Sequence, residues 1–236
     1  MFVDVATDRV RDGATPDRSW TRTAVLVVVW WVAIATIVIS VGWLITHPFL
    51  DVVGPRDDDV VRWFADQRTP FLDDVAEYGT WGGETVVTLV VAPILAIGCW
   101  VLTRSVVPAL FVLLVICGVG GFYWAGTMLV PRRRPPVHIL DPGLVPTDSF
   151  PSGHVGTAVA LYGAVVVLTW TYARSRRWFV TPLLVMPVFV LLSRLYQGAH
   201  HLTDVLTSLM YGFTWLAVVA ALVLRGHHQA AKVPMR

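Results

Sequence analysis

The chain has 236 residues, of which 56% are hydrophobic and 14% are charged, and its mean hydropathy is +0.65. Soluble globular domains have about 45–50% apolar and about 25% charged residues, so this composition excludes that class and indicates a membrane protein. The formal net charge of +2 says little about partners, and we expect no nucleic acid among them. Cys99 and Cys117 lie in apolar runs, which is typical of small buried hydrophobes and gives no evidence for a disulfide or a metal site.

Six apolar runs predict an all-α, polytopic membrane protein with six transmembrane helices, because a hydrocarbon core about 30 Å thick needs about 20 residues. The first run is too long for a signal-peptide core of about 7–15 residues. The fifth is short by itself and can extend past Arg194 if that side chain faces the protein interior or the interface. The predicted spans cover residues 24–46, 85–103, 106–130, 155–173, 178–193 and 205–224.

We therefore expect one six-helix domain over residues 24–225, with polar tails at residues 1–23 and 226–236. The loop from residue 47 to residue 84 is acidic. Within it, spacings that place residues on one helical face predict an interfacial helix lying on the membrane, and a solvated loop is the alternative. The residues at these spacings are Val60, Val61, Phe64 and Trp63.

The distribution of basic residues in short loops predicts the orientation of the spans. Both tails, the turn at Arg104 and the loop over residues 174–177 lie on one side, and all are basic. We expect that side to be the cytoplasm, with both termini there, in a plasma membrane of bacterial type. The other side holds the acidic loop and, against the rule, Arg132, Arg133 and Arg134. An anionic ligand explains this cluster, and attraction to lipid headgroups is the alternative.

Pro151-Ser152-Gly153-His154 lies where the second outer loop enters the fourth span. Ser152 can cap the helix, while the free backbone N–H groups of the first turn can bind an anion. Gly153 allows a phosphate to approach the backbone closely. As structure alone, Pro-Ser-Gly is an ordinary helix start, but His154 at the membrane boundary favours a functional role.

His200 and Asp204 are four residues apart, which predicts that they are neighbours on one helical face. Asp204 can then accept a hydrogen bond from one imidazole nitrogen and leave the other free to attack, as in a catalytic triad. A helix-start His and Asp facing headgroups and water is one alternative. A metal site of His154, His200, His201 and Asp204 is another, but the neighbouring Arg side chains repel a divalent cation and attract phosphate.

Arg194 lies six residues before His200. Its planar guanidinium suits bidentate contact with phosphate oxygens better than a Lys side chain would. An interfacial Arg that extends to the lipid headgroups is the alternative. Together these groups predict phosphate chemistry at the outer surface of the membrane.

These motifs resemble the signatures of the type 2 phosphatidic acid phosphatase superfamily, the membrane lipid phosphatases related to vanadium haloperoxidases. The second signature, P-S-G-H, is matched at residues 151–154, and the first, K-x6-R-P, is matched in part at Arg134-Pro135. The third signature, S-R-x5-H-x3-D, is matched at Ser193, Arg194, His200 and Asp204. The resemblance extends from about residue 25 to residue 225 and implies the six-helix topology of that family.

One position departs from the family pattern, because Thr127 stands where the first signature has Lys. A Thr donates one hydrogen bond and brings no charge, so the phosphate loses a cation. Arg132 or Arg133 is a candidate to replace it from the neighbouring loop. The alternative is a changed substrate preference, slow turnover, or a change from hydrolysis toward phosphoryl transfer between lipids.

The resemblance implies a metal-independent phosphatase that needs no cofactor. His200 is implied as the nucleophile that forms a phosphohistidine, Asp204 as the group that orients it, and His154 as the acid that protonates the leaving group and then activates water. The implied phosphate-binding residues are Arg134, Ser152, Gly153 and Arg194, with Arg132, Arg133 and Thr127 as further candidates.

The implied substrate is a lipid phosphate within the bilayer, of the polyprenyl diphosphate, phosphatidate or phosphatidylglycerophosphate type. Its chain would lie between helices, with the headgroup at the extracytoplasmic face where the site is expected. The alternatives are a lipid phosphotransferase of the same fold and a non-catalytic lipid-binding homologue. The oligomeric state stays open.

Overall fold

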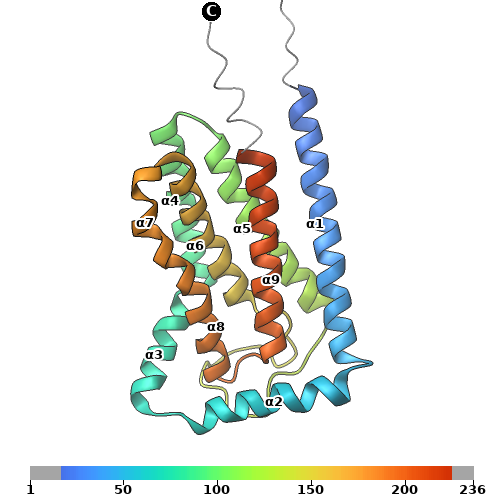
Figure 1. The fold of residues 1–236 in the computed structure, drawn as a ribbon. Coiled ribbons are helices and arrows are strands. Elements are labelled where there is room, and N and C mark those ends of the chain that lie inside the picture. The colour runs from blue at the N-terminus through green and yellow to red at the C-terminus, as the bar shows by residue number, and fades with distance from the viewer. Residues whose placement is uncertain (1–16, 225–236) are drawn as a thin grey trace, which may run out of the picture.

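The computed structural model describes residues 17–224, and every regular element in that range is helical (Figure 1), which confirms the predicted all-α class. Residues 1–16 and 225–236, which make up most of the two predicted tails, lie outside the described residues. The helices are α1 (Asp17–Thr46), α2 (Leu50–Asp66), α3 (Pro70–Trp81), α4 (Thr85–Thr103), α5 (Val107–Leu129), α6 (Gly153–Tyr172), η1 (Arg174–Arg176), α7 (Arg177–Val180), η2 (Thr181–Val185), α8 (Met186–Tyr196), α9 (Leu202–Val219) and η3 (Ala220–Leu224).

The described residues contain six helical segments long and apolar enough to cross a membrane, as predicted. The first helix begins at Asp17 rather than at residue 24, because a helix does not stop where its side chains become polar. The fifth segment, Arg174–Tyr196, is built from short helical pieces instead of one helix. Pro182 and Pro187 stand at the starts of η2 and α8, where a residue without a backbone N–H interrupts continuous helical hydrogen bonding.

The loop over residues 47–84 forms two helices, α2 and α3, where one was predicted. Pro70 begins α3, and the Thr69 hydroxyl caps it by accepting a hydrogen bond from the N–H of Leu72 at 3.3 Å. The predicted apolar face of α2 is only partly realised, because Val61 is fully buried while Trp63 is 59% exposed. Figure 1 shows α2 lying across one end of the bundle. Its placement in the membrane interface stays a prediction.

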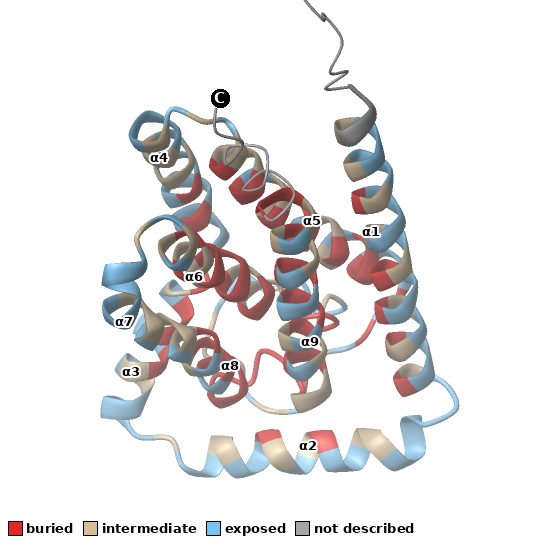
Figure 2. Ribbon diagram, turned by 45° about the horizontal axis from the view of Figure 1, so that its top comes forward, coloured by how far each residue is buried: buried red, intermediate tan, exposed pale blue. Residues whose placement is uncertain are grey.

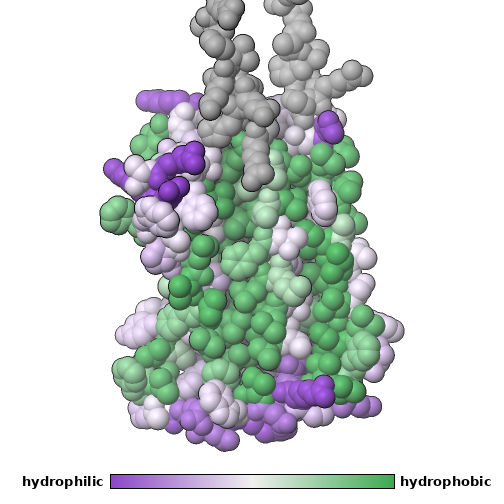
Figure 3. All heavy atoms as spheres, viewed as in Figure 1, coloured by the Kyte–Doolittle hydropathy of each residue, from purple (hydrophilic) through white to green (hydrophobic). Residues whose placement is uncertain are grey.

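The described ends of the chain lie at the same end of the bundle. Figure 1 shows the start of α1, the end of the helical segment that follows α9, and the turn between α4 and α5 at one end of the bundle, opposite α2. Figure 3 shows apolar side chains covering the visible side of the bundle between two polar ends. This arrangement matches the predicted alternation of the spans, and the assignment of one end to the cytoplasm stays a prediction.

Aromatic side chains hold the centre of the bundle between α1, α5 and α9. Phe122 stacks on Trp31 with ring centroids 5.3 Å apart and meets Trp215 edge to face at 5.6 Å. Gly118 makes this packing possible, because a Cβ there would lie 2.1 Å from the indole nitrogen of Trp215. Figure 2 shows buried residues concentrated on α5, α6 and α9. Helix α6, which begins at Gly153, therefore belongs to the buried part of the bundle.

Candidate active site

The predicted site residues gather at the α2 end of the bundle. They come from the end of α5, the loop over residues 131–152, the start of α6, the end of α8, the turn between α8 and α9, and the first turn of α9. Gly198 makes that turn with φ +73°, and a Cβ there would lie 2.5 Å from the side chain of Val137. A glycine is needed at this position, and it redirects the chain toward His200.

His200 is 3% exposed, and its Nδ1 lies 2.6 Å from the carbonyl oxygen of Ser149. A carbonyl oxygen only accepts hydrogen bonds, so Nδ1 carries the hydrogen and the neutral ring keeps its lone pair on Nε2. Burial, followed by the charges of Arg194 and Arg134, holds the pKa of His200 well below 6.5, although Asp204 acts in the opposite direction. The imidazole is therefore neutral at pH 7, with Nε2 able to act as a nucleophile.

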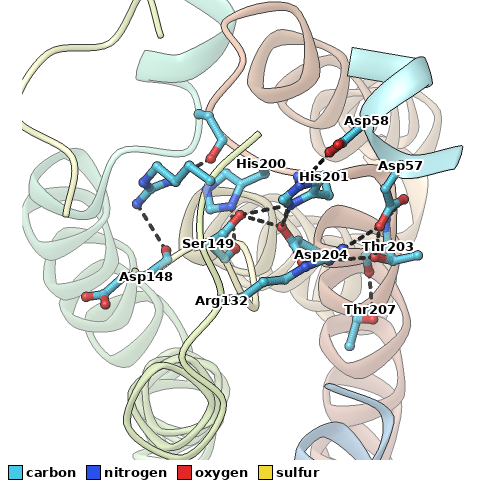
Figure 4. A network of polar contacts seen from close by, with 12 residues as sticks. Asp57, Asp58, Arg132, Asp148, Ser149, His200, His201, Thr203, Asp204 and Thr207 are labelled. Carbon is cyan, nitrogen blue, oxygen red and sulfur yellow. Dashed lines mark hydrogen bonds and ion pairs between the residues drawn. The ribbon is translucent and has the colours of Figure 1, made fainter. Parts of the chain in front are cut away.

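Asp204 does not bind His200 directly, which corrects the predicted contact. One carboxylate oxygen accepts from Ser149 Oγ at 2.6 Å and from the N–H of His201 at 2.9 Å. The prediction assumed a helix that includes both residues, but α9 begins at Leu202, so His200 lies before it. Asp204 instead caps the start of α9 and reaches His200 through Ser149, as Figure 4 shows.

Arg132 is 7% exposed and is held by two carboxylates. Its Nη1 lies 2.5 Å from Asp204 and its Nη2 lies 2.7 Å from Asp57 of α2 (Figure 4). Nη1 also donates to the Thr203 hydroxyl at 2.8 Å. The guanidinium is occupied by the protein's own anions, so Arg132 does not face a phosphate in this structure. Its charge on the predicted outer side is balanced by the acidic first loop.

Arg134 donates to three backbone carbonyl groups. Nε donates to Val145 at 2.8 Å, Nη1 to Ala199 at 2.6 Å and Nη2 to Asp148 at 3.0 Å. It thus ties the 131–152 loop to the turn that carries His200. Burial lowers its pKa, as does the charge of Arg194, which is near enough to act on it. A phosphate contact for Arg134 stays a prediction.

Two other candidates make no contact in this structure that would replace the missing Lys. Arg133 is exposed. The Thr127 hydroxyl donates within its own helix, at 3.2 Å from the carbonyl of Tyr123 and 3.0 Å from that of Trp124. The hydroxyl therefore satisfies its donor on the backbone of α5, and neither side chain replaces the missing Lys in this arrangement.

Arg194 is fully buried and binds protein groups through one nitrogen only. Its Nη1 lies 2.7 Å from Asp141, 2.8 Å from Gln197 and 3.3 Å from the hydroxyl of Thr80. Among the described residues, Arg194 Nε and Nη2 and the buried hydroxyl of Ser152 have no hydrogen-bond partner. Leaving such donors unpaired costs about 1–3 kcal/mol each. The unpaired edge of the guanidinium has the geometry for two phosphate oxygens.

His154 and Gly153 form the first turn of α6, after Ser152 at the N-cap. The Nε2 of His154 lies 3.3 Å from a carboxylate oxygen of Glu84, which precedes α4. Sequence reasoning did not identify Glu84 as a site residue, and it also missed Asp57, Asp141 and Ser149. All are acidic or polar residues outside the predicted spans and close to a motif or to a span, but no spacing rule connects them to a particular partner.

The proposed metal ligands do not form a metal site. Over residues 17–224, no group of three or more His, Cys, Asp or Glu side chains is arranged to hold a metal ion. His201 instead lies 3.4 Å from Asp58 and 3.3 Å from Asp204, between α2 and α9. The arrangement provides anion-binding donors around His200 and leaves the metal hypothesis without support from the geometry.

Two adjoining hollows reach the site from the hydrocarbon side. A cavity of about 230 Å³ is lined by Tyr123, Gly153 and residues of α4, α5 and α6. An apolar groove of about 470 Å³ lies between α4 and α5, and Thr88, Leu89 and Ile116 line both. A hydrophobic path therefore runs between these helices to the first turn of α6.

Residues 107–227 match the family model of the PAP2 superfamily. No curated protein matches the sequence. The fold is similar to the first transmembrane PAP2 type phosphatidylglycerolphosphate phosphatase from Bacillus subtilis, with TM-score 0.68, 21% identity and coverage of 89% of this chain and 98% of that chain. It is also similar to Aquifex aeolicus LpxE, with TM-score 0.55, 19% identity and coverage of 69% and 93%. Because the family model matches more than half of the sequence, the chain belongs to the PAP2 superfamily.

Proposed function

We propose that this integral membrane protein is a lipid phosphatase that works through a phosphohistidine on His200. One observation carries the proposal: Arg194 Nε and Nη2 and the hydroxyl of Ser152 are buried donors without a partner among the described residues. A phosphoryl group supplies the acceptors that these atoms lack. The neutral imidazole of His200 supplies a nucleophile whose ring is held by Ser149.

In the first step, the lone pair on His200 Nε2 attacks phosphorus and forms an N–P bond. The bond between phosphorus and the lipid oxygen breaks, and that oxygen keeps the electron pair and takes a proton from His154. Arg194, Ser152 and the N–H groups at the start of α6 stabilise the negative charge on the phosphoryl oxygens. The products are a free lipid alcohol, or a lipid monophosphate from a diphosphate, and the phosphoenzyme.

In the second step, His154 takes a proton from water as the water oxygen attacks phosphorus. The N–P bond breaks, its electrons return to His200 Nε2, and inorganic phosphate leaves. Each group is thereby restored to its starting protonation state. We propose that no metal takes part, because arginine and backbone dipoles supply the positive field that Mg²⁺ supplies in many phosphoryl-transfer enzymes.

The lipid part of the substrate fits the groove between α4 and α5. The groove is lined by apolar side chains of both helices, and Leu89 and Ile116 connect it to the cavity beside Gly153. The printed name of the Bacillus subtilis neighbour describes a phosphatase for phosphatidylglycerolphosphate, which supports a lipid phosphate as substrate here. We propose that the headgroup is bound at the extracytoplasmic face, with both termini in the cytoplasm.

Phosphate release by the detergent-purified protein tests the function. The substrates are phosphatidate, phosphatidylglycerophosphate and a polyprenyl diphosphate, each with EDTA present. We expect release from at least one of them. Loss of release in EDTA would overturn the metal-free mechanism, and transfer of phosphate to an added lipid alcohol without release would identify a phosphotransferase.

Trapping of the phosphoenzyme tests the nucleophile. Acid-labile, alkali-stable label from a ³²P-substrate should appear on the wild type and be absent from His200→Ala. The exposed His138, in the 131–152 loop, provides a matched control, because His138→Ala should retain the label. Label that persists in His200→Ala would move the nucleophile to another residue.

A further inference from the structure

The turn between α3 and α4 brings a carboxylate into contact with the first turn of α6. Glu84 Oε1 lies 3.3 Å from His154 Nε2, and the two side chains are 37% and 18% exposed. The two residues are separated by 70 positions in the sequence. No motif of the chain predicts this contact.

Close backbone packing builds the contact. Gly83 is buried against α6, and a Cβ there would lie 2.6 Å from the carbonyl oxygen of His154 and 2.8 Å from Val190 Cγ1. On the other side, the carbonyl of Glu84 accepts from the N–H of Thr88 at 3.1 Å and so belongs to the first turn of α4. Glu84 is thus held between a turn that admits only glycine and the start of a helix.

The remaining charges around His154 are of both signs. The charge of Arg194 acts on the imidazole from α8, and the charges of Arg134 and Asp141 act on it from the 131–152 loop. The two cations oppose a positive charge on the imidazole. Asp141 lies 2.7 Å from Arg194 and is engaged there, so Glu84 is the carboxylate in contact with the ring.

We propose that Glu84 is a positioning residue for His154. It holds the ring through Nε2, favours the protonated form, and leaves Nδ1 as the nitrogen that gives its proton to the leaving oxygen. This inference rests on the proposed function, in which His154 is the acid of the first step. Glu84 is 37% exposed, so solvent weakens its attraction for a protonated imidazole.

The test compares Glu84→Gln with Glu77→Gln in the purified full-length protein. Both residues line the same cavity of about 380 Å³. Of the two, Glu84 is the one that contacts His154. The two variants therefore remove the same charge from one cavity. The assay follows kcat and KM for dioctanoyl phosphatidate between pH 5 and pH 9.

For Glu84→Gln we expect the alkaline limb of the kcat profile to move to lower pH by about 0.5–1 unit. At pH values above the midpoint of the alkaline limb, kcat of Glu84→Gln should be about three- to tenfold below that of the wild type. KM should stay nearly unchanged, because Glu84 is not among the proposed phosphate-binding residues. Glu77→Gln should keep the wild-type profile, and Glu84→Asp should recover part of the shift.

A second readout separates positioning from a structural effect. With p-nitrophenyl phosphate the leaving group departs as p-nitrophenolate and needs no proton from His154, so the p-nitrophenolate burst of Glu84→Gln should match that of the wild type. An unchanged pH profile, or an equal shift in Glu77→Gln, would overturn the role of Glu84 while wild-type phosphate release keeps the proposed function intact. Absence of release and of phosphoenzyme in the wild type would instead remove the proposed function itself.

Discussion

His200 Nδ1 lies 2.6 Å from the carbonyl oxygen of Ser149, and the hydroxyl of the same Ser149 lies 2.6 Å from Asp204. One serine therefore connects His200, the proposed nucleophile, to the carboxylate that was expected to bind it directly. The backbone carbonyl orients His200, and the side chain links that backbone to the start of α9. The role of Asp204 as an orienting group stays a prediction, with Ser149 as the structural path for it.

Substitution Ser149→Ala tests this path. The variant keeps the carbonyl that accepts from His200 and removes only the hydroxyl that donates to Asp204. We expect kcat to fall about 5–13-fold with little change in KM, since the lost hydrogen bond contributes about 1–1.5 kcal/mol to orientation. Steady-state kinetics with phosphatidate measure both constants. A rise in KM alone would assign Ser149 to substrate binding.

The buried ion pair between Arg132 and Asp57 predicts how a substitution changes the free energy of unfolding. Asp57→Asn removes one of the two carboxylates that hold Arg132 and should lower the free energy of unfolding by about 3 kcal/mol, because it breaks a buried ion pair. Asp59 is the control: it lies two residues further on in α2, is 74% exposed and pairs with Arg62. Asp59→Asn should change stability by less than about 0.5 kcal/mol. Denaturant titrations in detergent compare the two.

The low pKa of His200 predicts a pH dependence of stability. In the unfolded chain the imidazole takes up a proton near pH 6.5, whereas the buried ring in the folded protein does not. Stability therefore falls as pH drops below about 6.5, and between pH 7 and pH 5 the wild type should lose about 2 kcal/mol more than His200→Gln. Unfolding titrations at both pH values measure this difference. Parallel pH curves for the two proteins would show that His200 is protonated in the folded state.

The unpaired edge of Arg194 predicts a strong effect of a charge-conserving change. Arg194→Lys keeps a cation but loses the Nε and Nη2 pair, so kcat/KM should fall about 100-fold, equivalent to about 2.7 kcal/mol of transition-state stabilisation. Arg133→Lys, at an exposed position of the 131–152 loop, should stay within about twofold of the wild type. Equal rates for Arg194→Lys and the wild type would exclude a bidentate contact.

The proposed orientation can be checked with cysteine labelling. Arg133 and Arg104 are both exposed. Arg133 follows Arg132, which pairs with Asp57 of α2, whereas Arg104 lies in the turn after α4, at the opposite end of the bundle in Figure 1. In a background without Cys99 and Cys117, a membrane-impermeant maleimide should label Arg133→Cys in intact cells and label Arg104→Cys only after the cells are opened. The reverse pattern would place the site at the cytoplasmic face.

The sequence by itself determined the number of spans and the chemical types in the site. Apolar runs near 20 residues carry enough hydropathy to identify spanning helices without knowledge of their neighbours, and six such segments are present in residues 17–224. The motifs at residues 151–154 and 193–204 likewise identified the family, because matching residue types and spacings are properties of the chain alone.

Only the tertiary structure decided which groups touch. The spacing between His200 and Asp204 predicted a direct contact on the assumption of a continuous helix, and the start of α9 at Leu202 removed it. Arg132 matched the expectation for an anion site, but it meets Asp57, which is 75 residues away in sequence. Such contacts depend on how separate helices pack, so no local pattern encodes them, and the partners of His200, His154 and Arg132 became known only from the folded chain.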